Sequence, residues 1–372
     1  MLAPNTKERA TLEVGGSLLE DWESVWVQKT WGDAYHQFRF VYAERQGEPG
    51  SEFNAIRQIK PGDSCTVKLA GQLAITGEVL TRQVAYDAYS HGVTIQGVSR
   101  TWKPATSSII HETHSYDGKS FLRIAREVLQ PTDQPDFETQ GTVDERPFKN
   151  VHSQPGEEIF PFLARIGQTR DIQIAATKEG RLIFIFPNAE TGNQGQLIEG
   201  QNILRCQCVI SIQQSRSKYK TIGSVNADGQ VKWRKASEKE AEAPGDEEFK
   251  GWRPLVTPIE APVDSDEELK KHAYNTSRWA EGTKVQATIV TTGWQPGGPG
   301  GGGELWEPGR EVTVDSPMAM LTEPVRIQSV TFTQDNNSGS LSTLVCVAPW
   351  ALQGRSKFKS KSVPPRPAQM VS

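Results

Sequence analysis

Two short segments from opposite halves of the chain carry the same pattern, and this repetition constrains the fold more than any other feature. Residues 61–67 read PGDSCTV and residues 308–314 read PGREVTV, so both fit P-G-x-x-x-T-V. Proline followed by glycine is typical of a turn, and the β-branched residues after it predict a strand. Each half of the chain is therefore expected to contain the same turn and strand, with Val67 equivalent to Val314.

A longer pair follows each of these segments in the same order. Residues 75–99 can be aligned with residues 326–349, and both read as two strands joined by a polar turn. A fixed spacing of 14 residues separates matching apolar positions in the two segments, which predicts that Val79 is equivalent to Val330. A third pair precedes them, because 25–40 and 209–224 both read as strand, polar turn and strand.

Three matches in one order indicate two copies of one β-unit. The first hundred residues contain six short strand patterns with period-two alternation, bounded by Gly, Pro and Asp. Such a series is typical of a small antiparallel barrel or sandwich. We therefore expect a mainly β protein with two antiparallel β-barrel-like domains, one over residues 1–103 and one over residues 196–352.

Residues 104–195 show a different pattern and are expected to form an α+β middle domain. Apolar residues recur at helical spacing in 117–131 and 155–170, and Pro161 is tolerable only because it falls in the first turn. A hairpin with a KEG turn is expected over 171–187.

The second β-domain contains an insertion at about 233–281. Residues 232–251 are charged, broken by proline and without a core face, so they are expected to be a solvated loop. A helix is expected over 264–282, with Ser265 and Glu268 as a capping box. Residues 353–372 are basic and without a core, which predicts an extended or disordered tail.

Composition excludes several functional classes. The net charge is −4 and the isoelectric point is about 6.0, so there is no global basic field to hold nucleic acid. Four cysteines are too few for a disulfide scaffold and favour a reducing compartment. We expect no signal peptide at the N-terminus and no membrane span, because no apolar run is long enough.

The segment GWQPGGPGGGGELWEPG, residues 293–309, is unusually rich in glycine. A phosphate-binding loop would need a Lys and a Ser or Thr after the last glycine, followed by a helix. Here Glu304 follows, and a strand pattern comes next. The segment is therefore expected to be a flexible hairpin tip with no ligand role.

No catalytic, cofactor-binding or metal-binding residue can be assigned from the sequence, and no cofactor is expected. His111 and His114 have a spacing that suits a metal on a helix, but no third ligand lies nearby, so they are expected to be polar residues at a domain junction. Cys206 and Cys208 are expected to share one strand face as small core residues.

Ten tryptophans are many for a chain of this length. Trp22, Trp26, Trp31, Trp294 and Trp306 lie in or near expected strands. Packing into the core is one interpretation, and an aromatic-rich subunit interface is the other.

The beginning of the chain resembles the phage Mu P-like family of tail baseplate hub proteins. In that family a strand ends in Gly-Gly and is followed by a tryptophan and a second strand. Val14, Gly15, Gly16, Trp22 and Val25 match this pattern.

The family's next hairpin resembles residues 75–99 of this chain. The matching positions are Ile75, Gly77, Val79, Tyr86, Asp87, His91, Val93, Gly97 and Ser99. Looser likenesses continue through GEEIFPFLARI, KEGRLIF, RPLV and LWEPGREVTVDSP, so that the resemblance covers roughly residues 10–352.

The resemblance implies a structural baseplate hub that forms a homotrimer at the distal end of the tail tube. Two barrel-like tube domains per chain would build a pseudo-six-fold ring between the hexameric tube and the trimeric central spike. The implied partners are the tube or distal tail protein, the spike and other baseplate proteins. DNA would only pass through the ring, and the implied location is the virion, after assembly in the host cytoplasm.

Two alternatives remain open at this stage. A tail-associated cell-wall hydrolase would need a carboxylate or Cys/His site in a cleft, and the sequence shows no such constellation. A carbohydrate-binding β module is suggested by the tryptophans, and it would not have to be trimeric.

Overall fold

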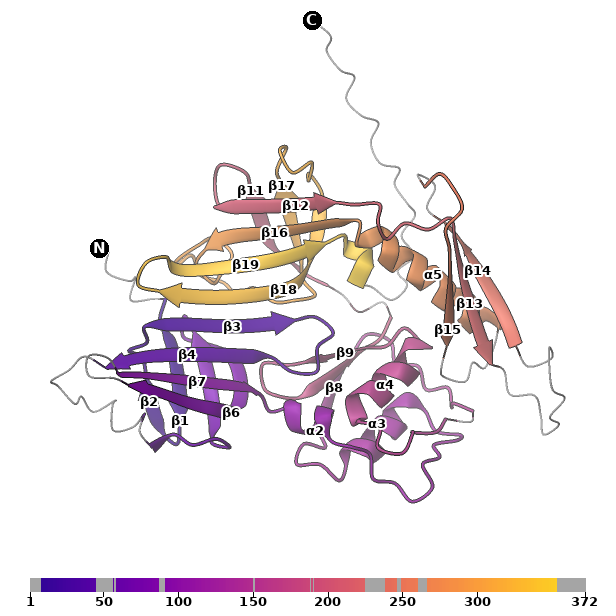
Figure 1. Cartoon of the computed structure of the whole chain (residues 1–372), viewed down its shortest axis with the longest axis horizontal. Helices are drawn as coiled ribbons and strands as arrows, with labels where there is room; N and C mark the ends of the chain where they lie inside the picture. Colours follow the sequence, from indigo (N-terminus) through magenta and orange to yellow (C-terminus); the bar gives the residue numbers. More distant parts are fainter. Residues whose placement is uncertain are drawn as a thin grey trace, which may run out of the picture.

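The fold is described from a computed structural model (Figure 1). It is mainly β, with a smaller α+β part, as the sequence predicts. Strands from both halves of the chain join into one large curled sheet, which is antiparallel except for the pairing of one edge strand. The residues described are 8–44, 56, 58–86, 91–149, 151–187, 189, 191–224, 238–245, 249–259 and 266–352.

The first half of the chain forms a half-barrel in which the strands lie in the order β2-β1-β5-β6-β7-β4-β3. Strand β6 is long: its first part pairs with β5, and most of its length pairs with β7. The bounds are β1 Ala10–Val14, β2 Ser17–Leu19, β3 Ser24–Thr30, β4 Gln37–Glu44, β5 Ser64–Leu69, β6 Gln72–Tyr86 and β7 His91–Ser99.

The second half repeats this arrangement, in the order β11-β17-β18-β19-β16-β12. Each strand corresponds, in both sheet position and chain order, to one in the series β1-β5-β6-β7-β4-β3. One difference is that β1 runs antiparallel to β5, whereas β11 runs parallel to β17. The bounds are β11 Asn193–Ile198, β12 Arg205–Ile210, β16 Val285–Thr292, β17 Glu311–Asp315, β18 Pro324–Asp335 and β19 Gly339–Val347; the short helix η1 follows at Pro349–Leu352.

Strand register refines the expected equivalences. The amide of Gly62 donates to the carbonyl of Val79, and the amide of Gly309 donates in the same way to Ile327. A β-bulge follows both acceptors. The prediction that Val79 is equivalent to Val330 is therefore wrong, and Ile327 is its counterpart. The connections of the two hairpins differ in length, so a fixed spacing does not mark equivalent positions.

The equivalence of Val67 and Val314 agrees with the register. In the first half Cys65 lies opposite Gly77, and in the second half Val312 lies opposite Val325. Two residues further along each strand lie Val67 and Val314, and both are fully buried.

The middle part of the chain forms a separate α+β unit with its own apolar core. Two of its helices, α3 and α4, follow the predicted apolar periodicity, and Pro161 is the third residue of α4. Strand β8 and helix α2 were not predicted, because their short sequences show no clear periodicity. The bounds are α2 Trp102–Thr106, α3 Phe121–Leu129, β8 Phe137–Gln140, α4 Ile159–Gln168, β9 Gln173–Ala176 and β10 Leu182–Ile185.

A second small unit interrupts the second half-barrel, and here two predictions are wrong. Residues 238–244, expected in a solvated loop, form strand β14, because Ala241 and Ala243 alternate with charged residues and are buried. Strand β13, expected to match the strand after the turn in 25–40, belongs to this separate sheet. The counterpart of β4 is β16. The bounds are β13 Lys218–Ser224, β14 Glu238–Pro244, β15 Pro254–Ile259 and α5 Asp266–Gly282.

Helix α5 covers the helix predicted at 264–282 and packs against this small sheet. The capping residue Ser265 and the tail at 353–372 lie outside the described residues.

Candidate functional site

The two half-barrels meet where β3 pairs with β18, and we call this pairing the seam. It joins Ser24–Thr30 to Ser329–Asp335 in antiparallel register (Figure 1). The seam converts two similar sheets into one, and both halves share a single apolar cluster. It is therefore the place where the structure shows how two copies of the repeated unit recognise each other.

Apolar side chains fill the inner face of the seam. Val27 lies opposite Phe332, and both are fully buried, while Val25 beside them is 3% exposed. Because residues directly opposite in an antiparallel pair point to the same face, these side chains pack against one another. Burying a side chain of this size contributes about 1.5–3 kcal/mol each.

A buried ion pair joins the seam, at the end where Thr30 lies opposite Ser329, to the segment that follows β16. The Lys29 ammonium lies 2.7 Å from a Glu307 carboxylate oxygen. The Lys29 side chain is 1% exposed and that of Glu307 is 29% exposed. A lysine this deeply buried needs a partner, because an unpaired charge in such a place is costly.

The glycine-rich segment 293–309 does connect two strands, β16 and β17, but its two ends are firmly packed. Trp294 and Trp306 are fully buried in the shared core. Gln72 of the first half bonds the segment twice, donating to the carbonyl of Gly303 and accepting from the amide of Leu305 at 3.2 Å. Only the tip of the segment is exposed, so the ends help to hold the half-barrels together.

The turn at Gly309 is another close contact across the two halves. Gly309 has φ +84°, a conformation that favours glycine. A side chain there would overlap the ring of Trp31, which follows β3. The counterpart Gly62 also has positive φ but faces open space. The repeated Pro-Gly turn thus has a packing role in the second copy alone.

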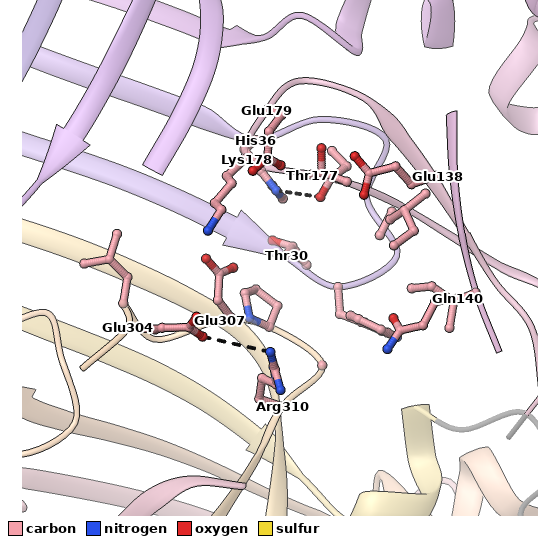
Figure 2. Close-up of a pocket in the computed structure, with 18 of the residues that line it drawn as sticks. Thr30, His36, Glu138, Gln140, Thr177, Lys178, Glu179, Glu304, Glu307 and Arg310 are labelled. Atoms are coloured by element: carbon pink, nitrogen blue, oxygen red, sulfur yellow. Dashed lines mark hydrogen bonds and ion pairs between the residues drawn. The ribbon is translucent and has the colours of Figure 1, made fainter. Parts of the chain in front are cut away.

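A polar cavity of about 390 Å³ lies beside the seam, bordered by both half-barrels and the middle unit. Figure 2 shows Glu304, Glu307 and Arg310 on one side of it, and Glu138 and Lys178 among the residues on the other. Its lining mixes acidic and basic groups.

His36 borders the same cavity and is buried. Its Nε2 lies 3.1 Å from the carbonyl of Ala176, so the ring donates to the middle unit (Figure 2). Burial, together with the nearby charge of Lys29, lowers the pKa of His36 to about 3. The imidazole is therefore neutral at physiological pH and acts as a structural contact between two parts of the chain.

The histidine pair noted in the sequence does not form a cluster with other ligands. His111 Nε2 lies 2.9 Å from the Glu127 carboxylate, which also binds Lys119 at 2.6 Å. His114 Nδ1 lies 2.8 Å from the hydroxyl of Ser153. In the described part of the chain, no group of three or more His, Cys, Asp or Glu side chains could hold a metal ion.

Cys206 and Cys208 lie on β12, half-buried, on the face that packs against the shared core. Burial raises the pKa of both thiols. Trp294 and Trp306 are core residues, and Trp22 and Trp31 pack partly buried against apolar clusters, whereas Trp252 and Trp279 are exposed. Among the described helices, none is both long and apolar enough to cross a membrane.

Buried polar residues in and near the seam were not singled out in the sequence. Lys29 and His36 stand in segments that were assigned only as strand and turn, and Arg326, 1% exposed, bonds Glu311 and Thr191. A charged residue at a core-facing position of an alternating strand is the one available signal. Lys29 has it, because Val25 and Val27 precede it at period two.

The N-terminal part of the chain is similar to a known family of proteins. Residues 9–99 match the family model described as Mu phage baseplate assembly protein GpP-like, N-terminal. The chain is also similar to the baseplate hub protein gp44 of Escherichia phage Mu. The identity is 22% over 346 residues, which is 91% of this chain and 87% of that protein. The resemblance inferred from the sequence is confirmed.

Two solved structures share the fold over nearly the whole chain. The 43 kDa tail protein of prophage MuSo2 from Shewanella oneidensis has a TM-score of 0.76 and 23% identity, covering 94% of this chain and 100% of that one. The tail protein from Neisseria meningitidis MC58 has a TM-score of 0.75 and 17% identity, covering 93% and 99%. These two structures show the fold, and the family match together with the similarity to gp44 supports a structural role in a phage tail baseplate.

Proposed function

We propose that this chain, whose residues 9–99 belong to the GpP-like family of Mu phage baseplate assembly proteins, is the hub of a phage tail baseplate. In this proposal three copies form a ring that joins the hexameric tail tube to the trimeric central spike. The ring carries out no catalytic step and needs no cofactor. It belongs to the tail baseplate of the virion and assembles in the host cytoplasm.

The observation that supports this proposal is the repeated strand order within one continuous sheet. A tube with six equal subunits offers six equal contacts, whereas a trimeric spike offers three. Three chains with two similar half-barrels each present six similar surfaces. The inserted unit with β13–β15 and α5 is present in the second half alone, so the true symmetry of the ring stays three-fold.

The proposed division of labour follows the parts of the chain. Residues 1–103 and 196–352 are the tube domains, and 104–195 is the middle domain. The sequence predicted the insertion at 233–281, and we now extend it to about 218–282, because β13 belongs to the inserted sheet. The ring faces contact the tube or distal tail protein on one side and the spike on the other, and other baseplate proteins bind around it. DNA passes through the opening without specific binding.

Electron microscopy of the purified protein tests the proposal. Class averages should show rings with six similar lobes and three additional densities for the inserted units. Rings with another number of lobes, or particles without a central opening at micromolar concentration, would refute it. A zymogram on cell-wall material should show no clearing, and a clear zone would instead favour a tail hydrolase.

A further inference from the structure

Several strand edges of the large sheet have no described strand beside them, and two of these edges lie on β12 and β6. Strand β12 pairs with β16 on one side, and no described strand lies on its other side. Strand β6 pairs with β5 only as far as Glu78, and no described strand pairs with the same edge of β6 beyond that residue. Strand β12 is the last strand at one end of this sheet order, and β6 is separated from the seam by β7 and β4.

These two edges correspond to the two strands of the seam. By sheet order, β12 is the counterpart of β3, and β6 is the counterpart of β18. Within one chain, β3 covers the distal part of β18, next to the place where β17 ends. The distal part of β6, next to the place where β5 ends, is the matching position, and none of the described strands covers it.

Equivalent side chains are buried at the seam and more exposed on β6 and β12. Phe332 of β18 is fully buried under β3, whereas its counterpart Val84 on β6 is 45% exposed. Val27 of β3 is fully buried, whereas its counterpart Cys208 on β12 is only half-buried. The same positions of the repeated unit are therefore buried at the seam and open at the two ends.

We propose that β12 of one chain pairs antiparallel with residues 81–86 of β6 in the next chain, repeating the seam between subunits. The inference rests on the proposed ring and names the surface that builds it. Internal and intersubunit seams then alternate around the ring, and every half-barrel has a neighbour on both sides. The occupant of each edge is a second copy of this chain.

The composition of the two edges supports a protein partner. Apolar side chains are exposed on and beside them: Leu80, Val84, Tyr86, Leu204, Val209, Ile210 and Ile212. Uncovered apolar edge strands promote uncontrolled pairing, and proteins that keep such an edge in solvent usually protect it with charges or proline. A contact between two different surfaces can also form a closed ring, if the rotation from one subunit to the next closes after a whole number of subunits. A self-complementary contact gives a two-fold dimer instead.

Transfer of the seam register gives a specific set of opposite residues. At the seam Phe332 lies opposite Val27, and Thr333 lies opposite Trp26. Their counterparts place Val84 opposite Cys208 of the neighbouring chain, on the inner face. Ala85 falls opposite Gln207 on the other face, and Tyr86 falls opposite Cys206.

This register can be tested by disulfide formation, because Cα atoms directly opposite in a sheet are about 4.5–5.5 Å apart, within reach of a disulfide. The full-length Val84→Cys variant is oxidised with copper phenanthroline and separated on a non-reducing denaturing gel. The expected result is a crosslinked dimer and trimer with no larger species, reversed by reductant. A ladder extending beyond the trimer would contradict a closed ring of three.

Two matched controls fix the register. Val84→Cys combined with Cys208→Ser should lose the crosslink, because the remaining Cys206 is a diagonal neighbour about 7 Å or more away. Ala85→Cys should not crosslink, because its side chain points to the opposite face. Equal crosslinking of these controls would overturn the proposed register.

The mass of each sample before oxidation separates failure of the interface from failure of the ring. A trimer in which Val84→Cys does not crosslink would overturn the intersubunit seam and leave the proposed hub intact. A monomer at micromolar concentration would overturn both.

Discussion

The buried ion pair of the seam allows a quantitative test of how the two half-barrels are joined. Glu307→Gln keeps the shape of the side chain but leaves the Lys29 ammonium without its carboxylate partner, which lies 2.7 Å away. Removal of one member of a fully buried pair costs about 3–5 kcal/mol. Because the Glu307 side chain is 29% exposed and water can reach it, we reduce the expected cost to about 2 kcal/mol.

The assay is chemical unfolding of the wild type, Glu307→Gln, Lys29→Met and the double variant. Lys29→Met removes the buried charge itself and replaces it with an apolar chain, so it should cost less than about 1 kcal/mol. The double variant should resemble Lys29→Met, so the magnitude of the coupling free energy should equal the cost of Glu307→Gln, about 2 kcal/mol. If Glu307→Gln stays within about 0.5 kcal/mol of the wild type, as for an ordinary surface substitution, the ion pair does not hold the seam.

Three further predictions concern neighbouring residues. The pKa of His36 is about 3 in the folded protein and about 6.5 in the unfolded chain, so the contribution of His36 to stability is complete above pH 6.5 and lost as the pH falls toward 3. The unfolding free energy of His36→Gln, measured between pH 7 and 5, should therefore fall less steeply than that of the wild type. Equal slopes would contradict this. Gly309→Ala should lower stability by about 2–4 kcal/mol, because the residue has positive φ and a side chain there overlaps Trp31. The control Gly302→Ala, at an exposed position with positive φ, should cost about 1 kcal/mol. Equal melting temperatures of the two variants would disprove the contact with Trp31. Replacement of the exposed tip 298–302 by a shorter turn should change the melting temperature little, since loop length affects stability by only about 0.6 kcal/mol per doubling, and a large loss would show that the tip itself is packed.

The sequence predicts those features that depend on local pattern. Period-two alternation identifies most strands of both half-barrels, and apolar spacing identifies α3, α4 and α5. The Pro-Gly turns also mark equivalent positions, because Gly62 and Gly309 make the same hydrogen bond in each copy. These features follow from residues close together in the chain.

The features that were missed depend on residues far apart. Strand β14 looks like a solvated segment because its buried face is made only of Ala241 and Ala243, which become core residues through their packing in the inserted unit. The seam joins residues about 300 positions apart, and no local pattern encodes the pairing of β3 with β18. The prediction that Val79 is equivalent to Val330 was wrong for a related reason. The two hairpins differ in length, and this length has to be known before their positions can be aligned.

The mass of the purified full-length chain in solution tests the central claim most directly. Light scattering or native mass spectrometry at micromolar concentration should give a trimer of about 123 kDa, three times the 41.1 kDa chain. A species of one or two chains at the same concentration, or an open series of larger assemblies, would contradict a hub built from three chains.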